Sequence, residues 1–262
     1  MSETHAHPYH LVPPSPWPAI GSASAFVLAV GGIQFMHGSP PWTLMVGLAM
    51  VIFTMAGWWR QVVKEATVEK AHTSAVQTGL RLGMALFIAS EVMFFVAFFW
   101  AFFFHGFQFN PSTEQWPPAG IETLNPWSIP FINTVILLSS GVTLMWGMSG
   151  LKKGNQGQLA NGLAASVILG FIFLGLQIYE YGEATFAFTD GIYPSTFYMA
   201  TGFHGFHVFV GAVFLAVCWF RARAGHFKEG SPVGLQAAEW YWHFVDVVWI
   251  FLFIWVYIWG GG

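Results

Sequence analysis

Long apolar runs separated by short polar, Gly-rich or Pro-rich stretches make up most of the chain. A helix that crosses a membrane needs about 20 mostly apolar residues, and a window of that length finds seven such runs. We expect transmembrane helices at residues 17–36, 42–62, 74–107, 127–150, 158–186, 194–221 and 236–259. The pattern therefore predicts an all-α integral membrane protein with seven transmembrane helices.

The spacing of these runs predicts how the chain is organised. Residues 1–16 are polar and contain three histidines but no Lys or Arg, so we expect a short N-terminal tail. The first two spans are separated only by residues 37–41, which predicts a tight helical hairpin over residues 17–62. A loop over residues 63–73 then leads to five spans within 74–262. Little chain remains for an extramembrane domain, so we expect the protein to act in or against the bilayer.

The positions of the basic residues orient the predicted helices. Successive spans alternate in direction, so the N-terminal tail and the loops after the second, fourth and sixth spans share one face. The nine Lys and Arg lie on that face or within about two turns of it: Arg60, Lys64, Lys70, Arg81, Lys152, Lys153, Arg221, Arg223 and Lys228. The opposite face holds Glu114, Glu122 and Asp190. Because Lys and Arg concentrate in cytoplasmic or matrix loops, we expect the N-terminus inside and the C-terminus outside.

The composition excludes several classes of protein. Charged residues are 8% of the chain and hydrophobic residues 55%, whereas soluble proteins carry about 25% charged residues. The same scarcity of positive charge, with a net charge of −3, argues against nucleic acid as a partner, because phosphate recognition needs clustered Lys and Arg. Cys218 is the single cysteine, which excludes an internal disulfide and haem attachment through a CxxCH motif.

Several carboxyl groups fall within or near the predicted spans, where each is a candidate functional group. Glu91 lies about 25 Å along the third span from its inner end and has no basic neighbour in sequence. It is a candidate for lipid binding, proton transfer or a hydrogen bond to a neighbouring helix. Glu180 and Glu183 fall near the outer end of the fifth span, where we expect them to be solvated or to pair locally.

The seventh span places Glu239, His243 and Asp246 at i, i+4 and i+7, on one stripe of a helix. A metal would need further ligands, for which His204 and His207 of the sixth span are the available donors. A Glu-x-x-His pair on each of two helices, as di-metal bundles require, does not occur. We therefore predict an internal hydrogen-bonded network that joins the sixth and seventh spans, and no metal site.

Three other functions of a seven-span protein can be weighed against the residues. A retinal protein needs a lysine within a span, but all five lysines fall in the predicted loops. A seven-helix receptor begins outside, whereas this chain is predicted to begin inside. An autonomous proton-coupled transporter remains as the alternative, because Glu91 and the stripe of Glu239, His243 and Asp246 could carry protons.

Six segments resemble subunit III of haem-copper cytochrome c oxidase, in the same order and along essentially the whole chain. They are HPYHLVPPSPWP (7–18), GLRLGMALFIASEVMFF (79–95), FWAFFFHG (99–106), WPPAGI (116–121), ATGFHGFHV (200–208) and WYWHFVDVVWIFLF (240–253). The last two segments are highly specific. The resemblance agrees with the seven spans and the inside N-terminus that were reached independently.

The resemblance implies a core subunit without redox centres. Such a subunit binds catalytic subunit I directly, with subunit II and possibly small accessory subunits in the same complex. The complex takes electrons from cytochrome c, reduces dioxygen to water and pumps protons, and its haem and copper lie on the partner subunits. In the family the first two helices form one arm of a V, the other five form a bundle, and phospholipids occupy the cleft. The membrane implied is a bacterial plasma membrane, with a mitochondrial inner membrane as the alternative.

The resemblance also implies a set of phospholipid-contacting residues. In this sequence they are Trp59, Lys64, Glu65, His72, Glu91, His207, Arg221, Arg223 and His226. Lys64 stands where mitochondrial members have arginine, which keeps the charge but loses the bidentate fork for phosphate. Ala224 replaces a lysine of the family, with Arg223 beside it. Several of these residues fall at the predicted inner membrane edge, where cationic and aromatic side chains meet lipid headgroups.

Overall fold

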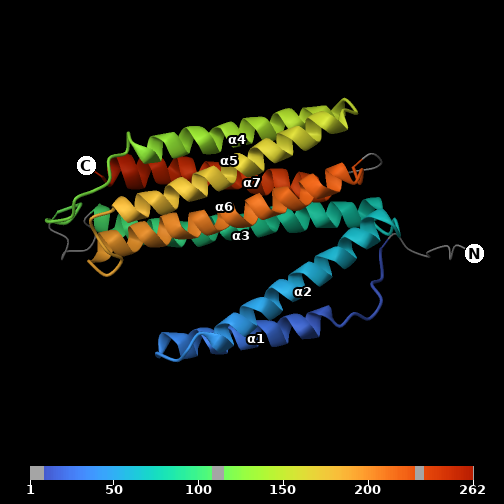
Figure 1. Cartoon of the computed structure of the whole chain (residues 1–262), viewed down its shortest axis with the longest axis horizontal. Helices are drawn as coiled ribbons and strands as arrows, with labels where there is room; N and C mark the ends of the chain where they lie inside the picture. Colours follow the sequence, from blue (N-terminus) through green and yellow to red (C-terminus); the bar gives the residue numbers. More distant parts are fainter. Residues whose placement is uncertain (1–8, 108–114, 228–232, 262) are drawn as a thin grey trace, which may run out of the picture. The chain divides into compact units, whose positions relative to one another are not determined.

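The computed structural model describes residues 9–107, 115–227 and 233–261, and this part of the chain is helical with no strand (Figure 1). The elements are α1 Trp17–Met36, α2 Trp42–Thr67, α3 Ser74–Gly106, α4 Ile129–Lys152, α5 Gln156–Glu183, α6 Ile192–Arg223, α7 Val233–Leu252 and the π-helix η1 Phe253–Trp259. Seven helices among the described residues, with α7 and η1 taken as one, are long and apolar enough to cross a membrane. The predicted all-α fold with seven spans is thereby confirmed, while the orientation of the termini stays a prediction.

The helix ends differ from the predicted ends mainly in α2, which continues from the expected end at residue 62 to Thr67. Gln61, Lys64 and Glu65 are good helix formers, and the Gln61 amide donates a hydrogen bond to the Glu65 carboxylate one turn on, at 3.1 Å. The hydropathy window ended the helix where apolar residues stop. Lys64 and Glu65 therefore lie on the last turns of a helix and not in the predicted loop.

The chain forms two compact units, Met1–Leu80 and Arg81–Gly262, and the boundary falls inside α3, seven residues after the predicted boundary between residues 73 and 74. In the first unit, α1 and α2 form the predicted hairpin. They approach closely at Gly47, where an added Cβ would lie 2.5 Å from the Leu28 Cα. A buried hydrogen bond between the Ser24 and Thr54 hydroxyls, at 3.1 Å, joins the same two helices.

In the second unit, α4 and α5 form an antiparallel pair that packs through small residues (Figure 1). An added Cβ on Gly162 would lie 2.5 Å from the Gly147 Cα, so the two backbones are nearly in contact. This close approach lets the Thr143 and Ser166 hydroxyls bond across the pair at 2.8 Å. Asn155 precedes α5 and its side chain accepts a hydrogen bond from the Gln158 N–H, which caps the helix.

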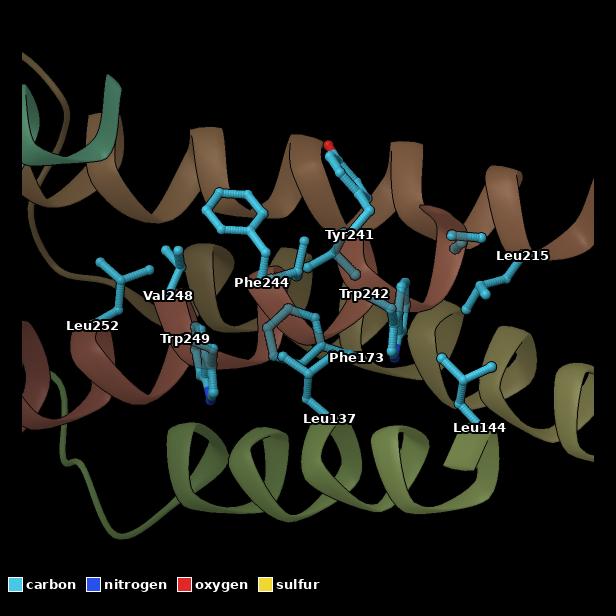
Figure 2. Packing of buried hydrophobic residues seen from close by; sticks show 14 of the residues in the cluster. Leu137, Leu144, Phe173, Leu215, Tyr241, Trp242, Phe244, Val248, Trp249 and Leu252 are labelled. Atoms are coloured by element: carbon cyan, nitrogen blue, oxygen red, sulfur yellow. The ribbon is translucent and has the colours of Figure 1, made fainter. Parts of the chain in front are cut away.

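The core of the second unit is built around two tryptophans of α7, Trp242 and Trp249, both fully buried. Figure 2 shows their indoles directed toward α4, with Phe173 of α5 between them. Each indole N–H donates to a hydroxyl of α4, Trp242 to Ser140 at 2.9 Å and Trp249 to Thr134 at 2.9 Å. The tryptophans thus fill the centre of the bundle without leaving a polar atom unpaired.

The part of α3 within the second unit contacts α6 and α7 mainly through aromatic rings. Ring centroids lie 5.0 Å apart for Phe94 and Phe203 of α6, and 4.4 Å apart for Phe99 and Phe251 of α7. At the other end of α3, the Arg81 guanidinium donates to the Gln236 side chain of α7 at 2.9 Å. We call these ring contacts the aromatic seam.

Charge divides the two ends of the bundle. The end where α4 and α6 finish carries Lys152, Lys153, Arg221 and Arg223, and we call it the basic end. The end where α5 and η1 finish and α4 and α6 begin carries Glu183 and Asp190 without Lys or Arg, and we call it the acidic end. This distribution matches the charge asymmetry seen in the sequence.

Candidate lipid-binding sites and buried polar groups

Four of the predicted lipid-contacting residues lie in the first unit, at or beyond the end of α2. Trp59 is exposed, and Lys64 is exposed and paired with Glu69 at 3.1 Å. Glu65 is buried, bonded to Gln61 and 3.8 Å from the His10 imidazole. Trp59 and Lys64 are therefore the members of this group that present an aromatic ring and a positive charge to the surroundings.

His72 lies in the segment between α2 and α3 and is less readily protonated than a free histidine. Partial burial lowers the pKa of His72, the Glu65 carboxylate opposes that shift, and His10 adds to it. The loss of solvation dominates because the imidazolium form depends on water more than the neutral form does. At neutral pH we expect His72 to meet a lipid headgroup as a neutral hydrogen-bonding group.

Two hollows on the α1–α2 hairpin could hold parts of a lipid. One of about 460 Å³ is lined by apolar and aromatic side chains, including Val51, Met55, Trp58 and Trp59, with the bonded pair of Ser24 and Thr54 inside it. A second of about 380 Å³ is lined by residues of the N-terminal segment and by the polar end of α2: Val12, Pro13, Ser15, Pro18, Trp58, Gln61, Val62 and Glu65. The first suits an acyl chain, because its two hydroxyls already satisfy each other.

Arg221, Arg223 and His226 lie together at the basic end of α6. The Arg221 guanidinium lies over the Phe227 ring at 4.8 Å, and its Nε is buried without a hydrogen-bond partner among the described residues. An added Cβ on Gly234 would lie 2.9 Å from Nη1, so the first turn of α7 confines the guanidinium. Arg223 lies over the Trp219 ring at 5.3 Å, and His226 is exposed. A fixed guanidinium with a free donor suits an anionic group such as a lipid phosphate.

Glu91 and His207, both predicted to contact lipid, are bonded to each other in the second unit. The Glu91 Oε2 lies 2.9 Å from the His207 Nε2, and the His207 Nδ1 lies 2.6 Å from the Phe203 carbonyl oxygen. A carbonyl oxygen only accepts, so Nδ1 carries a proton. The contact between Nε2 and Oε2 then holds one further proton, and the pair has no net charge whichever atom carries it. Glu91 thus fastens α3 to α6, one of the roles expected from its sequence position.

The stripe of Glu239, His243 and Asp246 is bonded only in part. The His243 Nδ1 and the Asp246 Oδ2 are 3.1 Å apart, and Asp246 lies against Gly141 of α4, where an added Cβ would be 2.6 Å from the carboxylate. Among the described residues, Glu239 makes no hydrogen bond to this pair. The link between α6 and α7 comes from His204, whose Nε2 lies 3.2 Å from the Val245 carbonyl oxygen.

Over residues 9–107, 115–227 and 233–261, no group of three or more His, Cys, Asp or Glu side chains lies close enough to hold a metal ion. His204 and His207, the donors that a metal at the stripe would need, each bond a protein carbonyl oxygen. The absence of a metal or haem from this chain stays a prediction.

Comparison with known proteins identifies the family. A family model described as cytochrome c oxidase subunit III matches residues 7–261. The chain belongs to this family. The curated cytochrome c oxidase subunit 3 of Marchantia polymorpha is 51% identical over 266 residues that cover 100% of both chains. That of Arabidopsis thaliana is 50% identical with the same coverage, and a probable cytochrome c oxidase subunit 3 of Rickettsia conorii is 47% identical over 99% of this chain and 96% of its own.

Membership of the subunit III family confirms the resemblance read from the six sequence segments. It also makes the chain an integral membrane protein and a component of a multisubunit oxidase complex. The relatives include plant and bacterial proteins, so both membranes considered from the sequence remain open. The roles of the individual lipid-contacting residues stay predictions.

One buried polar cluster of this subunit III chain was missed from the sequence. Glu180, expected to be solvated or locally paired, is 1% exposed and accepts a hydrogen bond from the Tyr257 hydroxyl at 2.6 Å. That expectation was wrong, because Tyr257 lies in η1 and 77 residues away in the chain. Gln177 completes the cluster. The spacing of Phe173, Gln177 and Glu180 at i, i+4 and i+7 was the available signal, since Phe173 marks that face as buried.

Proposed function

We propose that this chain is the non-redox core subunit III of a cytochrome c oxidase. In that role it binds and stabilises catalytic subunit I and shares the complex with subunit II and possibly small accessory subunits. The complex transfers electrons from cytochrome c to dioxygen and couples this reaction to proton pumping. The observation that carries the proposal is the family match along residues 7–261, reinforced by relatives of about 50% identity over the full length.

The proposal places haem and copper on the partner subunits and leaves this chain without an active site. The donors available here support that assignment. Cys218 is buried and is the single cysteine, whereas a dinuclear copper centre would want two. The imidazoles of His204, His207 and His243 each hydrogen-bond another protein group. The contribution of this chain would then be structural support for proton uptake during sustained turnover.

The proposal also assigns phospholipid binding to this chain. Arg221 supplies a confined guanidinium with an unpartnered Nε, and Trp59 lines an apolar hollow of about 460 Å³ on the hairpin. A cationic side chain near an anionic headgroup is worth about 1 kcal/mol. Loss of one such contact is expected to weaken lipid retention about fivefold.

Isolation of the complex tests the assignment to an oxidase. The membranes are solubilised in mild detergent, the complex that contains this chain is purified, and its subunits are identified by mass spectrometry. We expect a haem-bearing multispan partner, with haem and copper absent from the separated chain by metal analysis and visible spectra. A lone chain that carries a solute with protons across a vesicle membrane would instead establish the alternative transporter function.

Substitution of Arg221 tests lipid binding in the same complex. We expect Arg221→Ala to lower the phospholipid retained per complex and to shorten the duration of activity during turnover, with a near-normal initial rate. Lys152→Ala removes an exposed cation from the same end of the bundle and is the matched control, so its lipid content should match the unmodified complex. Equal phospholipid content in the two variants would refute the role given to Arg221.

A further inference from the structure

Glu180 is buried near the acidic end of the bundle, far from any positive charge of this chain. Its exposed fraction is 1%, and those of its neighbours Gln177 and Tyr257 are 3% and 2%. Lys152 and Lys153 lie near the opposite end of α5, about 35 Å away along the helix. The ionisable groups around Glu180 are the phenols Tyr181, Tyr198 and Tyr257, with the acids Glu183 and Asp190 near the end of the bundle. A carboxylate here would have no basic partner among the described residues.

The hydrogen bonds of the cluster are uneven across the carboxyl group. The Tyr257 hydroxyl and the Gln177 amide both donate to Glu180 Oε1, at 2.6 and 3.2 Å. Glu180 Oε2 and Gln177 Oε1 are buried, and no protein donor among the described residues reaches either of them. One oxygen of the carboxyl group is therefore bonded as a carbonyl oxygen would be, and the other is positioned as a hydroxyl would be.

A third unpartnered side chain lies level with this cluster on the facing helix. The bond between Thr143 and Ser166 sets the register of α4 against α5. Ten residues from Thr143 toward the acidic end is Asn133, and eleven residues from Ser166 in the same direction is Gln177. Asn133 is fully buried, and both polar atoms of its amide lack a protein partner among the described residues.

We infer that Glu180 is a neutral carboxylic acid with its proton on Oε2, and that this hydroxyl and the Gln177 carbonyl oxygen share a bound water molecule inside the bundle. The water accepts from Glu180 Oε2 and donates to Gln177 Oε1, which pairs both orphaned atoms. Asn133 is placed to supply a further partner, and a buried water normally makes two to four hydrogen bonds. The site lies outside the lipid-contacting groups and does not depend on the proposed function.

A bound cation is the rival way to neutralise a buried carboxylate. Hard cations prefer oxygen ligands and take about six or more of them. The cluster offers Glu180 Oε2, Gln177 Oε1 and Asn133 Oδ1, which are too few for a cation stripped of its own water. Protonation needs no further ligands, so the bond pattern favours the neutral acid.

Infrared spectroscopy of the intact complex tests the protonation state. The difference between the unmodified complex and its Glu180→Gln variant is expected to show the loss of one carboxylic C=O band, which shifts in D2O. The matched control is Glu183→Gln, an exposed residue three positions away on α5, whose difference spectrum should show the loss of carboxylate bands. Loss of carboxylate bands in the Glu180→Gln difference would overturn the inference.

Two further measurements keep the inference testable if Glu180→Gln prevents assembly. Tyr257→Phe retains Glu180 but removes the donor to Oε1, so the carboxylic C=O band should move to higher frequency. A band that does not move would contradict the assignment. A high-resolution cryo-EM map of the complex should show a water between Glu180 and Gln177, and either no density there or a peak with cation-like coordination would refute the bound water.

Discussion

Helices α4 and α5 approach until Gly147 and Gly162 lie backbone to backbone, whereas α3 meets α6 and α7 through phenylalanine rings 4.4–5.0 Å apart. Lipid tails are as apolar as the side chains themselves, so the burial of apolar surface does little to drive either contact. Helix association in a bilayer instead depends on close packing and hydrogen bonds between helices. The glycine contact obtains both from proximity, and the aromatic seam obtains its packing from ring contacts and its hydrogen bonds from long side chains.

The two contacts should differ in how they tolerate change. At the glycine contact the neighbouring atoms are backbone, which cannot move without separating the helices. In the aromatic seam the neighbouring atoms are side chains, and each ring pair contributes about 0.5–1.5 kcal/mol. Damage at the glycine contact should therefore be abrupt, and damage in the seam should be graded.

The largest effect is expected from Gly162→Leu. Its Cβ alone would lie 2.5 Å from the Gly147 Cα and 2.7 Å from the Thr143 carbonyl oxygen, so α4 and α5 must separate. We expect a loss of more than about 3 kcal/mol, seen as failure of the subunit to accumulate in the purified complex. Gly175→Ala on the same helix, with no atom within 4 Å of the added Cβ, is the control and should assemble normally. Normal assembly of Gly162→Leu would show that the contact has slack.

The next effect is expected from Phe95→Ala in the seam. Phe95 is 1% exposed and lies against Phe99, His207 and Phe244, so truncation leaves a cavity that costs about 3 kcal/mol in soluble cores. The bilayer removes part of that cost, and we expect a lower unfolding temperature in an assembled complex. Met93→Ala, at a position 65% exposed on the same helix, should leave that temperature unchanged. Equal shifts for the two variants would argue against a packed seam.

A smaller effect is expected at the hydrogen bond between α3 and α6. Glu91→Leu leaves the His207 Nε2 without its partner, which costs about 1–3 kcal/mol for a buried group. Glu91→Gln keeps a donor for the neutral imidazole and should be close to the unmodified protein. SDS titration of the full-length chain in mixed micelles, followed by tryptophan fluorescence, measures both variants. If Glu91→Gln lowered the initial oxygen reduction of the complex more than about tenfold, the carboxyl group would be on an obligatory proton path instead.

The smallest effect is expected from Ser166→Ala at the glycine contact. The Ser166 hydroxyl bonds Thr143 and the Ser140 carbonyl oxygen across the helix pair, and such bonds are worth on average about 0.6 kcal/mol in a membrane protein. The same SDS titration should resolve this shift from that of Ser90→Ala, an exposed serine of α3 bonded within its own helix. A shift above that of Glu91→Leu would reverse the order of the two contacts.

The sequence predicted the spans well because hydropathy depends on each helix alone. The bounds of α1 were predicted at both ends, and the error at the end of α2 arose where a helix continues through polar residues. The π-helical geometry of η1 left no mark in the hydropathy pattern.

Contacts between helices were beyond the sequence because they depend on which faces meet. Glu91 and His207 were both recognised as candidates, but their bond joins residues 116 positions apart. Glu180 was misjudged for the same reason, since its depth is set by Tyr257 of η1. The His243–Asp246 bond was accessible from the sequence because both residues lie on one helix.

The shared proton of Glu91 and His207 makes this fastening insensitive to the membrane voltage. The pair carries no net charge with the proton on either side, so only a shift of the proton along the 2.9 Å bond would couple to the field. A unit charge that crosses the roughly 30 Å hydrocarbon layer gains about 2.3 kcal/mol per 100 mV. Even a full traverse of the bond along the field would change the energy by only about 0.2 kcal/mol at 100 mV, which is below thermal energy. The attachment of α3 to α6 should hold equally in an energised and in a discharged membrane.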